Sequence, residues 1–203
     1  VEEIAYVLDD ADTVAVAFEA ATRASTGEAI ARHDDVALVS LDIDAGDFEV
    51  LLKSPPVDGP SAVDDSELCL MLYTSGTTGR PKGVPRSHRA ERLAATHCIA
   101  QLYYQRGESS LCVMPIFHTM GVRAMLMAIL LNGALVCQRT WDAEVAMQMI
   151  QQEKIDTLFL VPTLFHDMLH HPKRGAYDLS SVQNIGFAGM AMTSDLTEVC
   201  QKE

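Results

Sequence analysis

The alternation of apolar and polar residues predicts helices and strands that follow one another along the chain. Near the start, Ile4, Val7 and Leu8 recur at helical spacing, and a β-branched run follows a few residues later. The first segment therefore predicts a helix over 2–10, a strand over 13–18, a helix over 20–32 and a strand over 36–41. A strand, a helix and a second strand in this order favour a parallel sheet with right-handed crossovers.

The same alternation continues beyond residue 60. Apolar runs predict strands over 68–73, 110–114, 134–138, 157–161 and 182–187. Helical spacing predicts helices over 88–105, 123–131 and 143–152, and Pro162 is placed to open one more. We therefore expect an α/β fold of mostly parallel sheets flanked by helices.

Two polar stretches interrupt the pattern in the first third of the chain. The stretch from Lys53 to Ser61 contains three prolines and a glycine, which is the composition of a linker. We place a boundary there, and expect an N-terminal α/β segment over 1–60 and a second α/β segment over 61–203. The acidic stretch 42–47 lacks the closing glutamate of a calcium loop, so a solvated turn is predicted instead.

The acidic charge of the chain is concentrated near its start. The net charge is −13, but the first 67 residues hold 17 acidic and 3 basic side chains, whereas the rest hold 11 and 12. Around residues 80–92, five Lys and Arg side chains stand against Glu91 alone. A locally positive field is therefore expected there, while Arg89 and Arg92 are interpreted as a solvated helix face. Without an extended basic stripe or an aromatic platform, nucleic acid is a poor partner.

Composition places the chain among globular proteins. Hydrophobic residues make up 48%, which argues against disorder. The longest apolar run, from Ala124 to Leu131, is far shorter than a membrane span. The five cysteines show no Cys-x-x-Cys pair, so reduced and mostly buried thiols in a cytoplasmic protein are expected.

One glycine-rich stretch, from Leu72 to Gly83, carries the clearest chemistry. It follows an apolar run and contains three threonines, a serine and, near its end, Lys82. Glycine lets successive backbone N–H groups point at one spot, hydroxyls add donors, and lysine adds positive charge. This combination suits an anion with several oxygens, such as a polyphosphate. The spacing does not match a P-loop, because Pro81 precedes the lysine and Gly83 follows it. From composition alone, a flexible loop without a ligand remains the alternative.

The stretch closely resembles the phosphate loop of the adenylate-forming superfamily, which includes acyl- and aryl-CoA synthetases, peptide-synthetase adenylation domains and luciferase. That pattern is an aromatic residue, Thr-Ser-Gly-Thr-Thr-Gly, one free position and Pro-Lys-Gly, and the residues from Tyr73 to Gly83 match it throughout. The resemblance implies a large-domain fold of the acyl-CoA synthetase type. It also implies that ATP is bound by Thr74, Ser75, Gly76, Thr77, Thr78, Gly79 and Lys82, with Lys82 taking part in catalysis.

A second element, Pro-x-Phe-His-x-x-Gly, is matched between Pro115 and Gly121. A histidine just past a strand lies where open α/β sheets place ligands, but local context favours a simple cap on the following helix. The resemblance implies that His118 serves catalysis as a gate or positioning residue between nucleotide and acid. It further implies that Met125 lines the acid pocket.

Small residues after the last predicted strand form a third element. Ala188 and Gly189 would allow a flat ring to approach the backbone, and the resemblance implies an adenine contact there, with Gly189 also bordering the acid pocket. Met190 departs from the family pattern, which is often Gly-Gly-Ala or Gly-Glu-Ala in this turn.

The resemblance implies a two-step reaction. A carboxylate attacks the α-phosphate of Mg·ATP, and in the CoA ligases coenzyme A then displaces AMP to give a thioester. No stretch matches the family's aromatic-Gly-x-Thr-Glu element, whose glutamate supplies the Mg²⁺ ligand, nor the C-terminal domain with its catalytic lysine. We therefore expect a central fragment that is inactive alone and takes a small carboxylic acid, ATP and coenzyme A in the whole protein.

Two alternatives stay open. One is an amino-acid-activating adenylation domain, although no aspartate for a substrate amine follows His118 closely. The other is a non-catalytic nucleotide- or anion-binding module.

Met125, Leu126 and Ile129 suggest an apolar pocket for an aryl or fatty acid.

Overall fold

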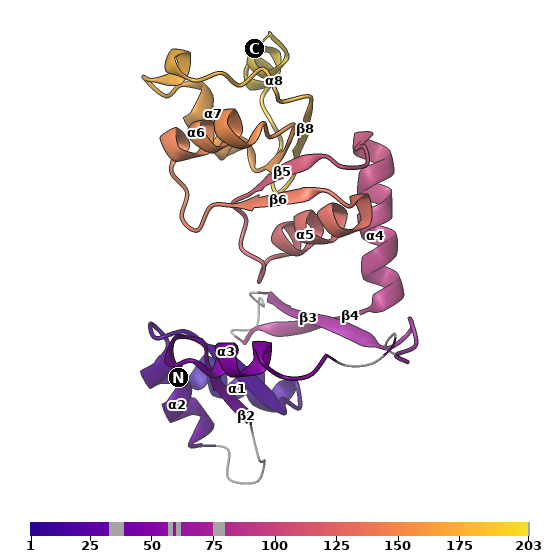
Figure 1. The fold of residues 1–203 in the computed structure, drawn as a ribbon, viewed down its shortest axis with the longest axis vertical. Helices are drawn as coiled ribbons and strands as arrows, with labels where there is room; N and C mark the ends of the chain where they lie inside the picture. Colours follow the sequence, from indigo (N-terminus) through magenta and orange to yellow (C-terminus); the bar gives the residue numbers. More distant parts are fainter. Residues whose placement is uncertain (33–38, 57–58, 60–61, 75–79, 203) are drawn as a thin grey trace. The chain divides into compact units, whose positions relative to one another are not determined.

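The computed structural model describes residues 1–32, 39–56, 59, 62–74 and 80–202 (Figure 1). The chain divides into two compact units. The first combines residues 1–64 with 73–85, and the second combines 65–72 with 86–203. Strands β3 (Leu68–Thr74) and β4 (Lys82–Ser87) pair as a two-stranded sheet.

The first unit is built around a short parallel pair of strands. Its elements are α1 (Glu2–Asp10), β1 (Ala15–Phe18), α2 (Arg23–Ile30), β2 (Val39–Asp42), the 3₁₀ helix η1 (Ile43–Ala45) and α3 (Asp47–Leu52). Strands β1 and β2 are parallel, with Ala15 opposite Val39, and helix α1 packs against α2. The strand–helix–strand order predicted from sequence is confirmed, although residues 36–38 of the second predicted strand lie outside the described residues.

The stretch 42–47, predicted as a solvated turn, contains a single turn of 3₁₀ helix whose three residues are exposed. The Asp42 side chain accepts a hydrogen bond from the Ala45 backbone N–H and so opens η1, and the Asp42 N–H donates to the Asp47 side chain at 2.7 Å. Gly46 has φ +96°, and the left-handed turn there leads into α3. None of the α3 side chains is buried. Phe48, Leu51 and Leu52 recur at i, i+3 and i+4 in α3, but six residues are too few for this repeat to stand out in the apolar pattern.

The second unit contains a four-stranded parallel sheet in the order β6-β5-β7-β8. Its strands are β5 (Ser109–Cys112), β6 (Ala134–Cys137), β7 (Thr157–Leu160) and β8 (Asn184–Phe187). Its helical elements are α4 (His88–Leu102), α5 (Thr119–Leu131), α6 (Ala143–Glu153), α7 (Pro162–Leu169), η2 (Arg174–Ala176) and α8 (Ser194–Lys202).

Helices cover both faces of this sheet (Figure 1). Leu158 belongs to a core with residues of α6, α7 and α8, whereas its neighbour Phe159 belongs to a core with residues of α4 and α5. Successive side chains of a strand point to opposite faces, so this pair marks the two layers. All four residues of β7 are buried. A strand enclosed on both faces is typical of parallel sheets, and the predicted mixed helix–strand arrangement is confirmed.

Two helix predictions of the second unit need correction. The helix predicted over 123–131 begins at Thr119, because His118 caps it and Gly121 in its first turn weakens the apolar signal. Helix α8 was not predicted; its Leu196 is buried against the α6–α7 core. Within the described residues, no helix combines the length and the apolar character that crossing a membrane requires.

The expectation of mostly buried cysteines is also wrong. All five are free thiols, but only Cys112 is buried, and Cys69 and Cys137 are exposed. Cys137 ends the edge strand β6, where one side of the strand has no neighbour. Burial raises the pKa of the Cys112 thiol to about 11.

We predict that Gly121→Ala destabilises the second unit by at least about 2 kcal/mol, the scale of overpacking in a dense region. A Cβ at this position would lie 2.2 Å from the Pro115 carbonyl oxygen, and backbone cannot yield as a side chain does. Urea unfolding followed by circular dichroism measures the change. Gly175→Ala is the matched control, because nothing lies within 4 Å of its Cβ, and it should stay within about 0.5 kcal/mol of wild type. Equal stability of the two variants would contradict the packing constraint.

Candidate functional site

The first part of the candidate site is the pair of strand ends that carry the glycine-rich loop. Thr74 ends β3, Lys82 begins β4, and the Thr74 hydroxyl donates to the Lys82 carbonyl oxygen at 3.5 Å. Both side chains are exposed. The loop residues Ser75, Gly76, Thr77, Thr78 and Gly79 lie outside the described residues, so their predicted role in ATP binding stays a prediction.

Helix α1 braces both ends of this loop. The Tyr73 hydroxyl donates to Asp10 at 2.7 Å, and the Tyr6 hydroxyl donates to the Pro81 carbonyl oxygen at 3.1 Å. The two tyrosine rings meet edge to face, with centroids 6.3 Å apart, and the Arg80 guanidinium lies 5.7 Å from the Tyr6 ring centre. Sequence reasoning missed this brace. Its only local signal is the i, i+4 spacing that puts Tyr6 and Asp10 on one face of α1.

An open cavity of about 900 Å³ lies beside the brace. Its lining mixes both signs of charge and comprises Glu2, Glu3, Ala5, Tyr6, Asp9, Arg32, Tyr73, Thr74, Arg80 and Pro81. Burial and the hydrogen bond to Asp10 raise the pKa of Tyr73 to about 12, so this phenol is a neutral hydrogen-bond donor at physiological pH.

The second part of the candidate site is the carboxyl edge of the parallel sheet in the second unit. His118 follows β5, Val161 follows β7, and Ala188 follows β8. Because β7 pairs with both β5 and β8 in parallel, the three strands end at the same edge. Met120, Val161 and Ala188 belong to one apolar cluster, which brings the start of α5 and the turn after β8 together. Open α/β sheets bind their ligands at such an edge.

His118 caps helix α5, as the local context of the sequence predicts. Its Nδ1 accepts a hydrogen bond from the Met120 backbone N–H at 3.3 Å. A neutral imidazole that accepts at Nδ1 carries its proton on Nε2, so the exposed ring can offer one further donor. This geometry orients the ring for contact with a ligand oxygen. The gate or positioning role of His118 stays a prediction.

The turn after β8 has a left-handed backbone conformation at Gly189. Gly189 has φ +88°, and a Cβ there would lie 3.3 Å from a methyl group of Val161. Ala188 is partly buried, whereas Gly189 and Met190 are exposed. Met125 is partly buried on α5. The binding roles predicted for Ala188, Gly189 and Met125 stay predictions.

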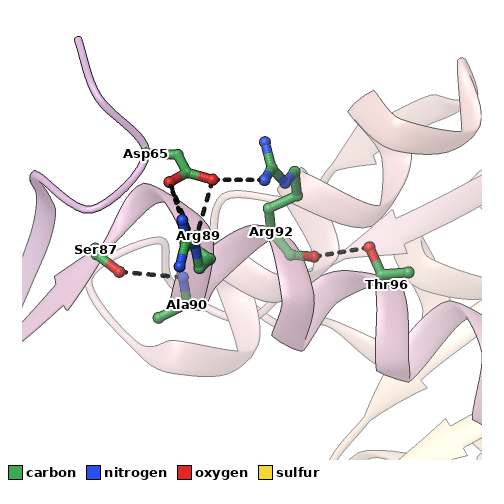
Figure 2. Close-up of polar contacts among 6 residues, drawn as sticks. All are labelled: Asp65, Ser87, Arg89, Ala90, Arg92 and Thr96. Atoms are coloured by element: carbon green, nitrogen blue, oxygen red, sulfur yellow. Dashed lines mark hydrogen bonds and ion pairs between the residues drawn. The ribbon is translucent and has the colours of Figure 1, made fainter.

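Several cations near the start of α4 are paired with acids. Figure 2 shows Asp65 between Arg89 and Arg92, with the Asp65 carboxylate 2.9 Å from each guanidinium. The hydrogen bond from Arg89 and its charge hold the pKa of Asp65 below its usual value. Both arginines are more than half exposed, as a solvated face requires. The positive field expected from the sequence around residues 80–92 is reduced, because Asp65, which lies outside that range, pairs with two of its arginines.

A buried ion network joins β4, α4 and α5 within the second unit. Glu91 is 5% exposed and Arg123 is 7% exposed. The Glu91 carboxylate lies 2.7 Å from Arg86 Nε and 3.4 Å from an Arg123 Nη, and Arg123 also donates to the Glu91 carbonyl oxygen at 3.2 Å. A charge inside the otherwise apolar run of α5 is the sequence signal that could have revealed this network.

The fold and the sequence together place the chain in a known family. The family model for AMP-binding enzymes matches residues 1–203, and the chain therefore belongs to the AMP-binding enzyme family. This agrees with the resemblance of the loop from Tyr73 to Gly83.

Curated relatives are longer proteins. A feruloyl-CoA synthase from Amycolatopsis sp. is 29% identical over 157 residues, which cover 77% of this chain and 31% of that protein. A 4-chlorobenzoate–CoA ligase from Pseudomonas sp. is 29% identical over 153 residues, which cover 74% of this chain and 28% of that protein. The chain thus spans about a third of the length of these relatives.

Solved structures show the same fold. The N-terminal domain of FACL13 from Mycobacterium tuberculosis matches with a TM-score of 0.88 at 21% identity, covering 99% of this chain and 51% of that chain. ATP-bound MatB from Rhodopseudomonas palustris matches with a TM-score of 0.82 at 19% identity, covering 100% of this chain and 40% of that chain. The predicted acyl-CoA synthetase-like fold is confirmed.

We predict that Glu91→Leu alone costs about 3–5 kcal/mol of unfolding free energy, because it leaves Arg123 buried without its carboxylate partner. The double variant Glu91→Leu, Arg123→Met should recover most of that loss, since both buried charges are then gone and Arg86, whose side chain is 35% exposed, can be solvated by water. Chemical unfolding of the two single variants and the double variant measures the coupling. As a control, Asp65→Ala removes an exposed pair and should cost under about 1 kcal/mol. Strictly additive effects of Glu91 and Arg123 would contradict the network.

We also predict a loss of stability at alkaline pH that depends on Tyr73. Its pKa is 10.0 when unperturbed and about 12 in the folded protein, so the unfolded chain releases the proton first. The contribution is therefore complete below pH 10.0 and is lost as the pH rises toward about 12. Unfolding midpoints measured across this range for wild type and Tyr73→Phe test the assignment. An identical pH profile in the variant would refute it.

Proposed function

We propose that the protein to which these residues belong is an ATP-dependent acid–CoA ligase. It forms an acyl-adenylate from a carboxylate and ATP with release of pyrophosphate, and then passes the acyl group to the thiol of coenzyme A with release of AMP. The observation that carries the proposal is the loop pattern from Tyr73 to Gly83, in a chain of the AMP-binding enzyme family whose loop ends are braced by α1.

The loop holds the triphosphate. Threonine and serine hydroxyls and glycine N–H groups suit phosphate oxygens, and the exposed ammonium group of Lys82 suits the charge that develops on the leaving pyrophosphate. Fixed loop ends support this role. Because the hydrogen bonds of Thr74, Tyr73 and Tyr6 hold the loop ends before ATP arrives, less ordering is required on binding.

The carboxyl edge of the sheet binds the adenosine and the acid. The left-handed turn at Gly189 exposes backbone for the adenine ring, and His118, with its proton on Nε2, is the gate or positioning residue at this edge. Met125, with Leu126 and Ile129 on the same helix, provides apolar surface for the acid. Because Ala188 lies at the same edge, it is assigned a contact with the nucleotide as well.

Magnesium is expected with ATP. Within the described residues, no group of three or more His, Cys, Asp or Glu side chains is arranged to hold a metal ion by itself. A Mg²⁺ ion that arrives with ATP takes part of its coordination from the phosphates and needs only one or two carboxylates. The reaction steps above rest on the loop, Lys82 and His118.

The acid is proposed to be an aryl carboxylate. Three similar proteins are named as a feruloyl-CoA synthase, a 4-coumarate–CoA ligase and a 4-chlorobenzoate–CoA ligase, and each of these names denotes an aromatic acid. The apolar side chains of α5 fit an aromatic ring as well as a fatty chain. A cytoplasmic location is proposed with this function, since ATP and coenzyme A are intracellular substrates.

We predict that Lys82→Ala in the full-length protein weakens ATP-dependent turnover by about 2–4 kcal/mol, the scale of one lost charge-stabilising group. Pyrophosphate exchange, run in parallel with aryl carboxylates and fatty acids, measures both the loss and the preferred acid. Lys53→Ala is the matched control, because Lys53 is also exposed in the first unit and lies away from the loop in sequence. Unchanged exchange by Lys82→Ala, or nucleotide binding without any exchange by wild type, would overturn the ligase proposal.

A further inference from the structure

Three histidines gather at the end of helix α7 in the second unit, and the proposed ligase function does not use them. An open cavity of about 500 Å³ is lined by Trp141, Asp142, Ala143, His166, Asp167, His170, His171 and Pro172. His166 lies in the last turn of α7, and His170 is its C-terminal cap. Their rings stack, with centroids 4.2 Å apart and an interplanar angle of 23°.

The i, i+4 spacing places two imidazoles on one helical face. Paired histidines with this spacing bind transition metals, because their ring nitrogens can reach one ion without distortion of the helix. The stacked rings already lie side by side, so both side chains face the same space. In the stack the in-plane lone pairs of the two rings run side by side, so the two exposed side chains must rotate out of the stack to direct both nitrogens at one cation.

Hydrogen bonds of the rings determine which nitrogen is available. His170 Nδ1 lies 2.9 Å from the His166 carbonyl oxygen, which can only accept, so this Nδ1 carries the proton. In the neutral ring, Nε2 of His170 is therefore the atom with a free lone pair. Metal-binding histidines commonly donate the other ring N–H to a carbonyl in this way.

The surroundings favour a cation. The Asp167 carboxylate lies 3.8 Å from His166 Nδ1 and is held in place by a hydrogen bond from the Trp141 indole at 3.3 Å. The carbonyl groups at the end of α7 add the negative end of the helix dipole. Both features attract a positive ion to the space beside the two rings.

His171 lines the same cavity, but its hydrogen bond places the ring proton on the other nitrogen. Its Nδ1 accepts a hydrogen bond from the Lys173 backbone N–H at 3.3 Å, so its proton is on Nε2. A neutral ring in this state has no lone pair left to give. His171 is therefore a neighbour of the pair and not a third ligand, in agreement with the lack of a three-residue metal cluster among the described residues.

We propose that His166 and His170 form a two-histidine binding site for a divalent transition-metal ion, with water completing the coordination. Imidazole ligands select the zinc, copper and nickel group over Mg²⁺ or Ca²⁺, which prefer oxygen. The site is defined by the stacked pair, the tautomer set by the His166 carbonyl, and the adjacent Asp167.

The test is a calorimetric titration of the tag-free protein with Zn²⁺ at neutral pH, with reducing agent absent. Wild type should bind one ion at this site, and His166→Ala and His170→Ala should each weaken that binding at least ~10-fold, the scale on which metal sites respond to altered ligation. His171→Ala is the matched control from the same cavity and should bind as wild type does. Circular dichroism of each variant verifies that α7 is intact.

Two further readings make the outcome decisive. Acidic pH should abolish the binding, because protons compete with the metal for imidazole nitrogen. With Cu²⁺ in place of Zn²⁺, electron paramagnetic resonance should show coupling to imidazole nitrogens in wild type and its loss in the double variant. Binding that survives in His166→Ala or His170→Ala, as thiol ligation would, overturns the proposal, and so does a wild type that binds no ion.

Discussion

Strand β7 is the element on which the second unit depends. It is buried along its whole length and pairs in parallel with β5 on one side and β8 on the other. Leu158 points into one core and Phe159 into the other, so a single short strand supports both helical layers. Because parallel strands end at a common edge, this arrangement brings together the segments after β5, β7 and β8. The candidate residues His118 and Ala188 therefore lie at the same edge because β7 pairs with both strands that precede them.

The first unit solves a different problem, which is to fix the two strand ends between which the glycine-rich sequence runs. The brace from α1 does this at Tyr73 and Pro81 through hydrogen bonds of 2.7 and 3.1 Å. In this brace Tyr73 is a neutral donor, and the Asp10 carboxylate is its acceptor.

In the second unit, two carboxylates each pair with two arginines. Arg86 and Arg123 share the buried carboxylate of Glu91, and Arg89 and Arg92 share Asp65. The guanidinium groups therefore serve mainly to fix α4 and α5 in the second unit. Lys82 is exposed at the start of β4, and its ammonium group suits an anionic ligand of the loop. At the end of α7, by contrast, the histidine pair is exposed beside a carboxylate, which is the arrangement that suits a metal cation.

Local sequence patterns were enough to predict much of the fold and the family of this protein. The alternation of apolar runs predicted the strands of the parallel sheet, and the loop pattern from Tyr73 to Gly83 predicted the family, because both signals lie within short windows of sequence. Helix α3 was missed because a helix of six residues is too short to show a clear apolar repeat, and α8 because the core against which Leu196 packs is formed only in the folded unit. Only the tertiary structure decided that Asp10 meets Tyr73, that Asp65 meets Arg89, and that Glu91 meets Arg123. These partners are far apart along the chain, and nothing in the local sequence of one member specifies the other.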